Sequence, residues 1–470
     1  MSGKHENSSP SGPTGVESIA RWVLGINDRD LPRSCVAQAR LLLLDSIGCA
    51  IAGAGEDVCK NVVAMCNEVG GQGPCTIIGQ SRALDLPHAV LANGALVRAL
   101  DLNDYVISPG RNGPLIGGHP SDNIPVALAA GEARRRPGSE ILATIAIGYE
   151  LFGRLKGMMD RKGPWDGVSL SAFVASAMAG RLMGLDADQL AHALALSGAR
   201  AATPAIVRRG GVSAAKSISN AMVAQSAVEA TLLAARGVTG PLSILEHQKG
   251  LRTLFPTGDI HETMSAPFPS HGYIMRAHVK MYPCLATGQA AVAAALRLHE
   301  RLRDRLDTVE RIEVVMADHA FLREQQEDPG RVRPRSREAA DHSFQFLVAV
   351  ALADGALGPA QFENERWLDP RVDALMKRIV TRVDPDLNHR APDAWPCAVR
   401  VRDASGEEHA AEVLFPPGYS RDGMSVSEVI AKFHSAAASL GRDSRERIVA
   451  AVLAFDRAAS ADDLGAALRR

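Results

Sequence analysis

The stretch that decides the fold is LDLNDYVISPGRNGPLIGGHPSDNIP, residues 100–125, which joins the end of one predicted helix to the start of another. Asp101, Asn103 and Asp104 follow the first helix, and a Gly-rich loop then leads to His119. The letters PSDN that come next are strong helix-start residues. A helix N-terminus exposes N–H groups and the positive end of the helix dipole, so it suits a bound carboxylate or phosphate. His119 is therefore well placed for proton transfer, and the alternative is a capped helix after a surface loop.

The composition is that of an ordinary globular protein, with 46% apolar and 22% charged residues. A length of 470 residues allows about three domain-sized units with a large core. Aromatic residues make up only 4% while Ala and Gly are abundant, which favours closely packed helices over a β-sandwich. The net charge of −1 gives no general electrostatic footprint for nucleic acid or a membrane, so we expect neither as a partner.

The cysteines and the lack of a recognisable targeting signal indicate in which cell compartment we expect the protein. The seven cysteines include no CxxC pair and are odd in number, which is typical of buried thiols in a reducing compartment. We find no signal-peptide pattern and expect no apolar run long enough to span a membrane. The sequence therefore predicts a cytoplasmic protein.

Four regions follow one another along the chain. Residues 1–14 form a polar tail that we expect to be disordered. Residues 15–275 repeat apolar positions every three to four residues, as helices do. Within residues 276–420, VERIEVVMA predicts a half-buried strand, and CAVRVRD and HAAEVLFP flank ASGEE like a hairpin. Residues 421–470 return to helical periodicity. The predicted fold is mainly α, a large all-helical domain interrupted by a smaller α+β lid domain.

Common cofactor signatures are missing from the chain. It contains no GxGxxG after a strand, no GxxxxGK[ST], no HExxH and no GxSxG. Its cysteines offer no iron–sulfur ligand set. We therefore expect no cofactor and no metal, with chemistry supplied by side chains.

Two lysine segments carry candidate chemistry. RRGGVSAAKS places Arg208, Arg209 and Lys216 around a Gly pair before a predicted helix. Such a lysine can neutralise a substrate carboxylate or stabilise an enolate-like intermediate, whereas most lysines are simply solvated at the surface. HVKMYPCLATGQAAVAAAL places Lys280 at the predicted domain junction, where ligand sites tend to lie.

Two further segments combine polar residues with apolar helices. EAADHSFQFLVAVALADG puts Asp341 and His342 at the head of a predicted buried helix, where Asp341 or Ser343 also fits a helix cap. GPWDGVSLSAFVASAMAG gives Trp165 and Asp166 ahead of a small-residue helix. A Trp in such a place is more often part of the core than a ligand contact.

Together these segments resemble the MmgE/PrpD family, which includes 2-methylcitrate dehydratases, cis-aconitate decarboxylase and iminodisuccinate epimerase. The resemblance covers the chain after its tail and rests on five ordered blocks. These blocks are RALDLNDY…GGHPSDNIPVALA, RRGGVSAAK, VKMYPCLATGQAA, EAADHSFQFLVAVALADG and PPGYSRDGMSVSEVIAKF.

The resemblance implies a helical body with an α+β lid, usually as a homodimer, and a metal-free site for a small carboxylic acid between the two domains. Asp341 and His342 match the family's DHS block. The residues that it implies for catalysis are Asp101, His119, Lys216 and Lys280, to which we add Tyr105. The expected substrate-binding residues are Ser121, Arg111, Arg208, Arg209, Trp165 and His342.

The chain departs from the family pattern at several positions. Tyr105 stands where the family usually has Thr, and Gly167 stands where the dehydratase branch usually has His. The triplet LAT at residues 285–287 replaces E-Y-H, and a longer loop carries Arg111. We expect Tyr105 to fill part of the space beside Gly167, as a phenol that serves better as an acid than as a base near neutrality.

The resulting functional hypothesis is a cofactor-independent lyase acting on a small di- or tricarboxylic acid, most simply a citrate or 2-methylcitrate dehydratase. An isomerase, epimerase or decarboxylase of a related acid is the alternative, because each needs only part of the same acid–base set. A weakened family member that binds or regulates is a third possibility. Because Gly167 offers no imidazole, we expect citrate and 2-methylcitrate to be poor substrates.

Overall fold

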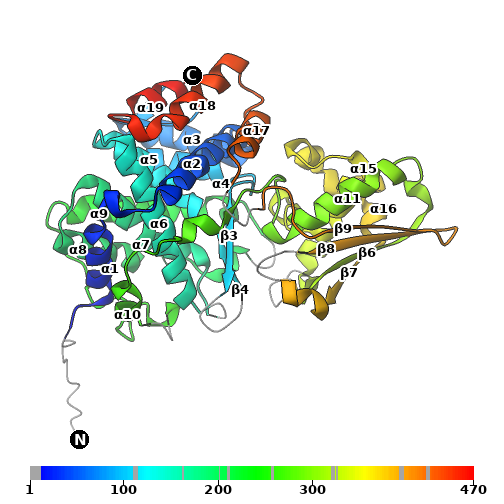
Figure 1. Cartoon of the computed structure of the whole chain (residues 1–470), viewed down its shortest axis with the longest axis horizontal. Helices are drawn as coiled ribbons and strands as arrows, with labels where there is room; N and C mark the ends of the chain where they lie inside the picture. Colours follow the sequence, from blue (N-terminus) through cyan, green and yellow to red (C-terminus); the bar gives the residue numbers. More distant parts are fainter. Residues whose placement is uncertain are drawn as a thin grey trace, which may run out of the picture.

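The computed structural model describes residues 12–109, 115–160, 163–200, 202–208, 212–255, 259–318, 323, 326–390, 396–419 and 424–469. Helices predominate, so the predicted mainly-α class is confirmed. Two large hydrophobic cores divide the described residues, one built from residues 16–279 together with residues 429–468, the other from residues 284–413. Figure 1 shows the two resulting bodies side by side, the helical body and the smaller body. The tail predicted as disordered lies outside the described residues up to position 11.

In the part of the chain that the structure describes, ten α-helices of the helical body come before residue 276. They are α1 (Gly15–Gly25), α2 (Arg33–Gly53), α3 (Asp57–Val69), α4 (Leu86–Arg98), α5 (Ile124–Ala133), α6 (Gly138–Met158), α7 (Ser171–Met183), α8 (Ala187–Arg200), α9 (Ala215–Ala234) and α10 (Ile260–Ser265). Small residues let them approach closely: a Cβ added to Gly94 of α4 would lie 2.8 Å from the Cβ of Ala221 in α9. Close packing of this kind explains why so few aromatic residues fill so large a core.

The last helices of the chain complete the helical body. They are α17 (Val426–Ala436), α18 (Arg442–Leu453) and α19 (Asp462–Leu468). Figure 1 shows α18 and α19 in red above α2 and α3, next to the C-terminus, and α17 in orange to the right of α2. Val429 and Phe433 of α17 are buried in the main core, so the return of the chain after the smaller body is held by apolar packing.

The smaller body is a four-stranded sheet covered by helices. The strand order is β7 (Ile379–Asp384), β6 (Val309–Ala317), β8 (Cys397–Asp403) and β9 (Glu408–Val413). The predicted strand and hairpin are β6 and β8–β9, whereas β7, which pairs in parallel with β6, was not predicted. The helices of this body are α11 (Gln289–Leu302), α13 (Pro329–Val332), α14 (Arg337–Ala340), α15 (Phe344–Asp354) and α16 (Pro370–Met376). Both α11 and α15 lie against the sheet (Figure 1).

The helical body also holds two small sheets that helical periodicity does not predict. One pairs β1 (Gln72–Thr76) with β2 (Ala83–Leu84). The other has the order β4 (Leu115–Gly118), β3 (Tyr105–Pro109) and β5 (Ala277–His278). Part of the loop predicted after Asp104 is therefore a pair of strands, β3 and β4, and it brings Tyr105 opposite His278, two residues before Lys280.

One helix corrects an expectation about apolar runs. The 21 residues of α2 include a window of 18 residues with a mean hydropathy of 1.5, long and apolar enough to cross a membrane. Of that window, 78% is buried inside the protein, because α4, α6 and α17 pack around it. By length and composition, then, one helix in the described part of the chain does reach a membrane span.

Candidate active site

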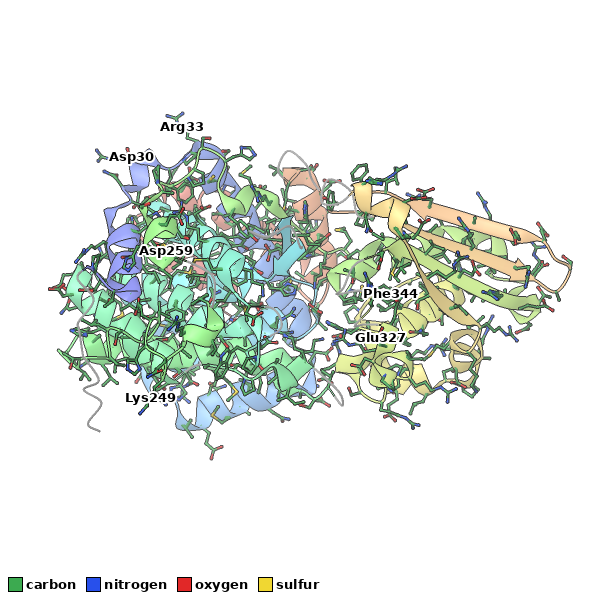
Figure 2. The ribbon with its side chains drawn as sticks, turned by 90° about the horizontal axis from the view of Figure 1, so that it is seen from below. Asp30, Arg33, Lys249, Asp259, Glu327 and Phe344 are labelled. Atoms are coloured by element: carbon green, nitrogen blue, oxygen red, sulfur yellow. The ribbon has the colours of Figure 1, made fainter. Side chains whose placement is uncertain are left out.

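A cavity of about 560 Å³ lies where the two bodies meet. Its wall from the helical body includes Asp101, His119 and Lys216, and its wall from the smaller body includes His342. Figure 2 shows Glu327, another lining residue, on the side of the smaller body that faces the helical body. Small-molecule sites are commonly found between domains, and this volume is that of an ordinary ligand pocket.

Asp101 is the centre of a buried ion cluster. It follows α4 in a left-handed backbone conformation with φ of 51°, which Asp tolerates better than most residues. Arg98 donates to its carboxylate, and the Nζ of Lys280 lies 2.5 Å from the same oxygen and 2.8 Å from the Asp101 carbonyl. Burial would raise the pKa of this carboxyl, but Arg98, Lys280 and Lys216 outweigh burial and hold the pKa well below its usual range. Asp101 is therefore a fixed carboxylate at the cavity wall.

Lys216 connects the helical body to the smaller body. Its Nζ, at the start of α9, donates to both carboxylate oxygens of Asp341 at 2.7 and 3.0 Å, and lies 3.8 Å from Asp101. Burial lowers the pKa of Lys216 to about 8, although Asp341 and Asp101 oppose this shift. An ammonium with such a pKa is a cation at neutral pH and can also give up a proton, so it suits both charge stabilisation and acid catalysis.

Two imidazoles face this cluster. The Nδ1 of His119 lies 2.7 Å from the Asp104 carbonyl, which fixes the hydrogen on Nδ1 and leaves Nε2 unprotonated, 3.9 Å from Asp101. Burial and the nearby Arg98 lower the pKa of His119 well below its usual value. Burial together with Lys216 lowers the pKa of His342 to about 4. Both rings are therefore neutral at pH 7, and His119 can accept a proton at Nε2.

A polar network lies behind the loop that carries Asp101. The side-chain amide of Asn103 donates to Ser121 at 2.9 Å and to Asp122 at 2.8 Å. Tyr149 donates to the carboxylate of Asp104 at 2.9 Å, and burial raises the pKa of Asp104 to about 7. Ser121 is fully buried and is absent from the described cavity wall. The structure thus places Ser121 in support of the loop rather than at the cavity.

Another part of the cavity wall comes from α6, from the segment before α7 and from Arg208. Trp165 lines the cavity and donates to Thr253 at 3.1 Å, so it is not simply a core residue. The Nε of Arg208 lies 3.0 Å from the carboxylate of Asp166. Beside Gly167, an added Cβ would lie 2.8 Å from the Nζ of Lys156, and no atom of Tyr105 is within 4 Å of that Cβ.

The other predicted residues divide into three groups. Tyr105 is buried in β3 and lines the cavity, and burial raises its pKa, so the phenol keeps its proton. Lys280 is fully buried behind Asp101 and is absent from the described cavity wall, so it acts on Asp101 rather than touching the cavity. Arg111 and Arg209 lie outside the described residues.

Sequence reasoning missed several lining residues and left open which residue caps α15. Arg98, Lys156 and Asn220 all line the cavity. Arg98 had a signal, because a cation one helical turn before an acid often pairs with it. The cap of α15 is Ser343, which accepts from the backbone of Phe346, so Asp341 is left for Lys216.

Three ligand atoms suited to a metal lie close together, on Asp101, Asp341 and His342, within 4.8 Å of one another. Two of these groups are already neutralised, Asp101 by Arg98 and Lys280 and Asp341 by Lys216. A divalent cation would have to displace ammonium groups from these carboxylates. The donor set therefore fits an ion-pair cluster better than a metal site.

The fold and site define a class of protein: two bodies, mainly helical, with a buried acid–base cluster at their junction. The profile of the MmgE/PrpD N-terminal domain matches residues 17–263, and that of the MmgE/PrpD C-terminal domain matches residues 282–457. The chain belongs to the MmgE/PrpD family.

Relatives in this family carry named activities. The chain is 26% identical to the cis-aconitate decarboxylase of Mus musculus over 460 residues, covering 93% of this chain and 90% of the relative. It is 27% identical to the 2-methylcitrate dehydratase of Salmonella typhimurium over 428 residues, covering 84% of each. It is 23% identical to the cis-aconitate decarboxylase of Aspergillus terreus, covering 96% of this chain and 95% of the relative. These relatives are dehydratases and decarboxylases, which supports a lyase-like role.

Proposed function

We propose that the protein is a lyase that removes water from a small tricarboxylic acid of the citrate or 2-methylcitrate type, without a metal. The observation that carries this proposal is the pairing at one cavity of a neutral imidazole, His119, with an ammonium, Lys216, whose pKa is about 8. Dehydration needs such a pair, because one group must remove a carbon-bound proton while another protonates the departing hydroxyl.

The steps follow from this geometry. Nε2 of His119 takes the proton from the carbon next to a carboxylate, and the electron pair of that C–H bond moves toward the carboxylate. Arg98 and Lys216 face the cavity as cations and stabilise the charge that develops there. The electron pair then returns to form a C=C double bond as the C–O bond breaks, and Lys216 gives a proton to the hydroxyl, which leaves as water. Asp101, held ionised by Arg98 and Lys280, keeps these cations in position.

Decarboxylation is a second candidate, and the extensive match to the mouse cis-aconitate decarboxylase favours it. Loss of CO₂ leaves an electron pair on carbon, which must then receive a proton. Lys216 can supply that proton, so the reaction needs the acid of the site but no base. Isomerisation or epimerisation needs only removal and return of a proton at His119.

An NMR assay in deuterated water tests these alternatives together. Citrate, 2-methylcitrate, cis-aconitate, tartrate and iminodisuccinate-like acids are each incubated with the protein. Loss of water from an acid supports a dehydratase, and loss of CO₂ supports a decarboxylase. Deuterium exchange without loss of water or CO₂ supports an isomerase or epimerase. Because Gly167 provides no side chain, we expect 2-methylcitrate to react with kcat/KM below about 10⁴ M⁻¹s⁻¹, the lower end for natural substrates. No change in any acid would contradict the proposal.

We also propose that the protein is a homodimer. Two large apolar side chains of α9 remain exposed in the single chain, Met222 at 55% and Leu233 at 44%. Apolar surface of this kind is a common part of an interface between identical subunits. Light scattering at micromolar concentration is expected to give twice the mass of 49.8 kDa, and a monomer would contradict the proposal.

A further inference from the structure

One residue of the cavity wall is a neutral amide whose orientation is fixed. Asn220 lies on α9, one helical turn after Lys216, and both residues line the cavity. Residues four apart on a helix share a face, so the amide of Asn220 lies next to the side chain of Lys216. The hydroxyl of Ser171, the first residue of α7, donates to Oδ1 of Asn220 at 2.6 Å. Because this hydrogen bond holds Oδ1, the orientation of Nδ2 is fixed as well.

The Nδ2 of Asn220 carries one hydrogen more than the protein uses. An amide nitrogen has two hydrogens to donate. One of them goes to the backbone carbonyl of Asp122 at 3.2 Å, and this is the single acceptor for Nδ2 among the described residues. Only 3% of Asn220 is exposed, so the second hydrogen has little bulk water to donate to. A buried donor without an acceptor is unfavourable, and a ligand that accepts from it gains affinity.

The side chain of Asp122 supplies an acceptor in the same part of the wall. Asp122 belongs to the 3₁₀-helix η2 (Pro120–Asn123) and lines the cavity, and its Oδ1 accepts from Asn103 at 2.8 Å. Its Oδ2 lies 3.7 Å from the Nε of Arg98, which is too far for a hydrogen bond. Burial raises the pKa of Asp122, although Arg98 opposes this shift. A substrate carboxylate beside Asp122 would add a like charge, whereas a neutral group can donate to it.

A donor and an acceptor side by side fit a hydroxyl group, because a hydroxyl both accepts and donates a hydrogen bond. A carboxylate has no hydrogen to give to Asp122, and a carbon–carbon double bond neither accepts nor donates. Resting on the lyase proposal above, we propose that Asn220 and Asp122 bind the hydroxyl group of the substrate, so that the site prefers hydroxy acids to acids that lack a hydroxyl. The hydroxyl then lies next to Lys216, the group that protonates it as it leaves.

Calorimetric titration with tartronate and malonate tests this subsite without dehydration. The two dicarboxylic acids differ by one hydroxyl group, and tartronate cannot lose water because both carbons next to its C–OH carbon are carboxyl carbons. The parent is expected to bind tartronate about tenfold more tightly than malonate, as one or two neutral hydrogen bonds allow. Asn220→Leu keeps the size of the side chain without its N–H, and should reduce this preference to less than about threefold with little change in malonate affinity. Asn61→Leu, at an exposed position of α3, is the control and should keep the preference of the parent.

Ser171→Ala provides a second variant, which keeps the amide but removes the hydroxyl that orients it. Ser171 is absent from the described cavity wall, so we expect a preference between those of the parent and Asn220→Leu. If Asn220→Leu does not fold by circular dichroism, a reduced preference in Ser171→Ala supports the subsite and a full preference overturns it. An unchanged preference in Asn220→Leu, a parent that binds the two acids equally, or a parent that binds neither acid would also overturn it.

Turnover in the NMR assay bears on the lyase proposal alone. A parent that prefers tartronate through Asn220 but converts no acid keeps the hydroxyl subsite and refutes the lyase. A parent that dehydrates an acid but does not distinguish tartronate from malonate keeps the lyase and refutes the hydroxyl subsite.

Discussion

Two buried lysine–aspartate pairs lie near the same loop and differ in their surroundings. In each pair the Nζ of the lysine is 2.5 Å from a carboxylate oxygen, Lys280 with Asp101 and Lys432 with Asp45. Asp101 lines the cavity and is shared by several cations, which keep the pKa of its carboxyl well below the usual range. Asp45 lies in the interior with Lys432, and there burial dominates and raises the pKa of Asp45.

The difference teaches what each pair does. Shared by Arg98, Lys280 and Lys216, the carboxylate of Asp101 stays charged at a wall that a substrate can reach. The pair of Asp45 and Lys432 does not reach the described cavity wall, but Lys432 also donates to the carbonyl of Leu102 at 2.8 Å. The first pair therefore sets the electrostatics of the site, and the second sets the position of its backbone.

The largest effect that we expect is the loss of stability on breaking the interior pair of Asp45 and Lys432. Lys432→Met leaves the carboxylate of Asp45 buried without a partner, and we expect the free energy of unfolding to fall by about 3–5 kcal/mol. Replacing both groups, as Asp45→Leu with Lys432→Met, removes the uncompensated charge and is expected to recover most of this loss. Urea denaturation measures both. A loss below about 1 kcal/mol in the single variant would show that the pair does not hold the interior.

The second largest effect that we expect is the fall in kcat on removing a cation from the cluster around Asp101. Lys216→Met removes a cation that faces developing charge, and we expect kcat to fall about 10²–10³-fold, as for the loss of one preorganised donor. The same NMR assay measures this rate, and circular dichroism checks the fold. Lys60→Met, on the exposed surface of α3, is the matched control and should keep full activity. Equal activity in both variants would show that Lys216 is not part of the active site.

A smaller effect is expected in the pH dependence of kcat/KM, which depends on the protonation of Lys216. Because the pKa of Lys216 is about 8, its ammonium loses a proton as the pH rises past that value, and the cation is lost from the cavity wall. We therefore expect kcat/KM to decline above about pH 8, roughly tenfold per pH unit. Lys216→Arg, which stays protonated, should move this decline to higher pH. If kcat/KM of that variant declines at the same pH as in the parent, the decline belongs to another group.

The smallest expected effect is that of metal removal. Because lysines and Arg98 neutralise the carboxylates of the cluster, we expect activity to survive prolonged EDTA treatment unchanged. The control is the same incubation without chelator. Inactivation by EDTA with recovery on adding one divalent ion would mean that Asp101, Asp341 and His342 bind a metal in place of the ammonium groups.

The sequence predicted the fold class, because helical periodicity extends over most of the chain and β6, β8 and β9 have strand patterns. It did not predict β7, since its parallel pairing with β6 is a contact between distant segments. The family blocks led to His119, Lys216 and His342, which the structure brings to one cavity.

Other site residues left weak or different signals. Ser121 sits beside His119 in sequence, but its side chain points to Asn103, and local sequence does not fix that direction. Lys156 looked like any lysine on a helix, and only the missing side chain at Gly167 marked its place. Asp45 did have a signal, because a lone acid within the apolar run LLLLDSIGCAIAG needs a buried partner. That partner, Lys432, is too distant in sequence to be inferred from spacing.

The contact from Lys432 to Leu102 has a consequence for the order in which the protein is made. The two residues are 330 positions apart, so the ribosome releases the whole smaller body between them. Until α17 emerges, Asp45 lacks its ammonium and the loop that carries Asp101 lacks its support. Synthesis of the helical body thus begins first, yet the loop that carries Asp101 is completed only after the other body has emerged.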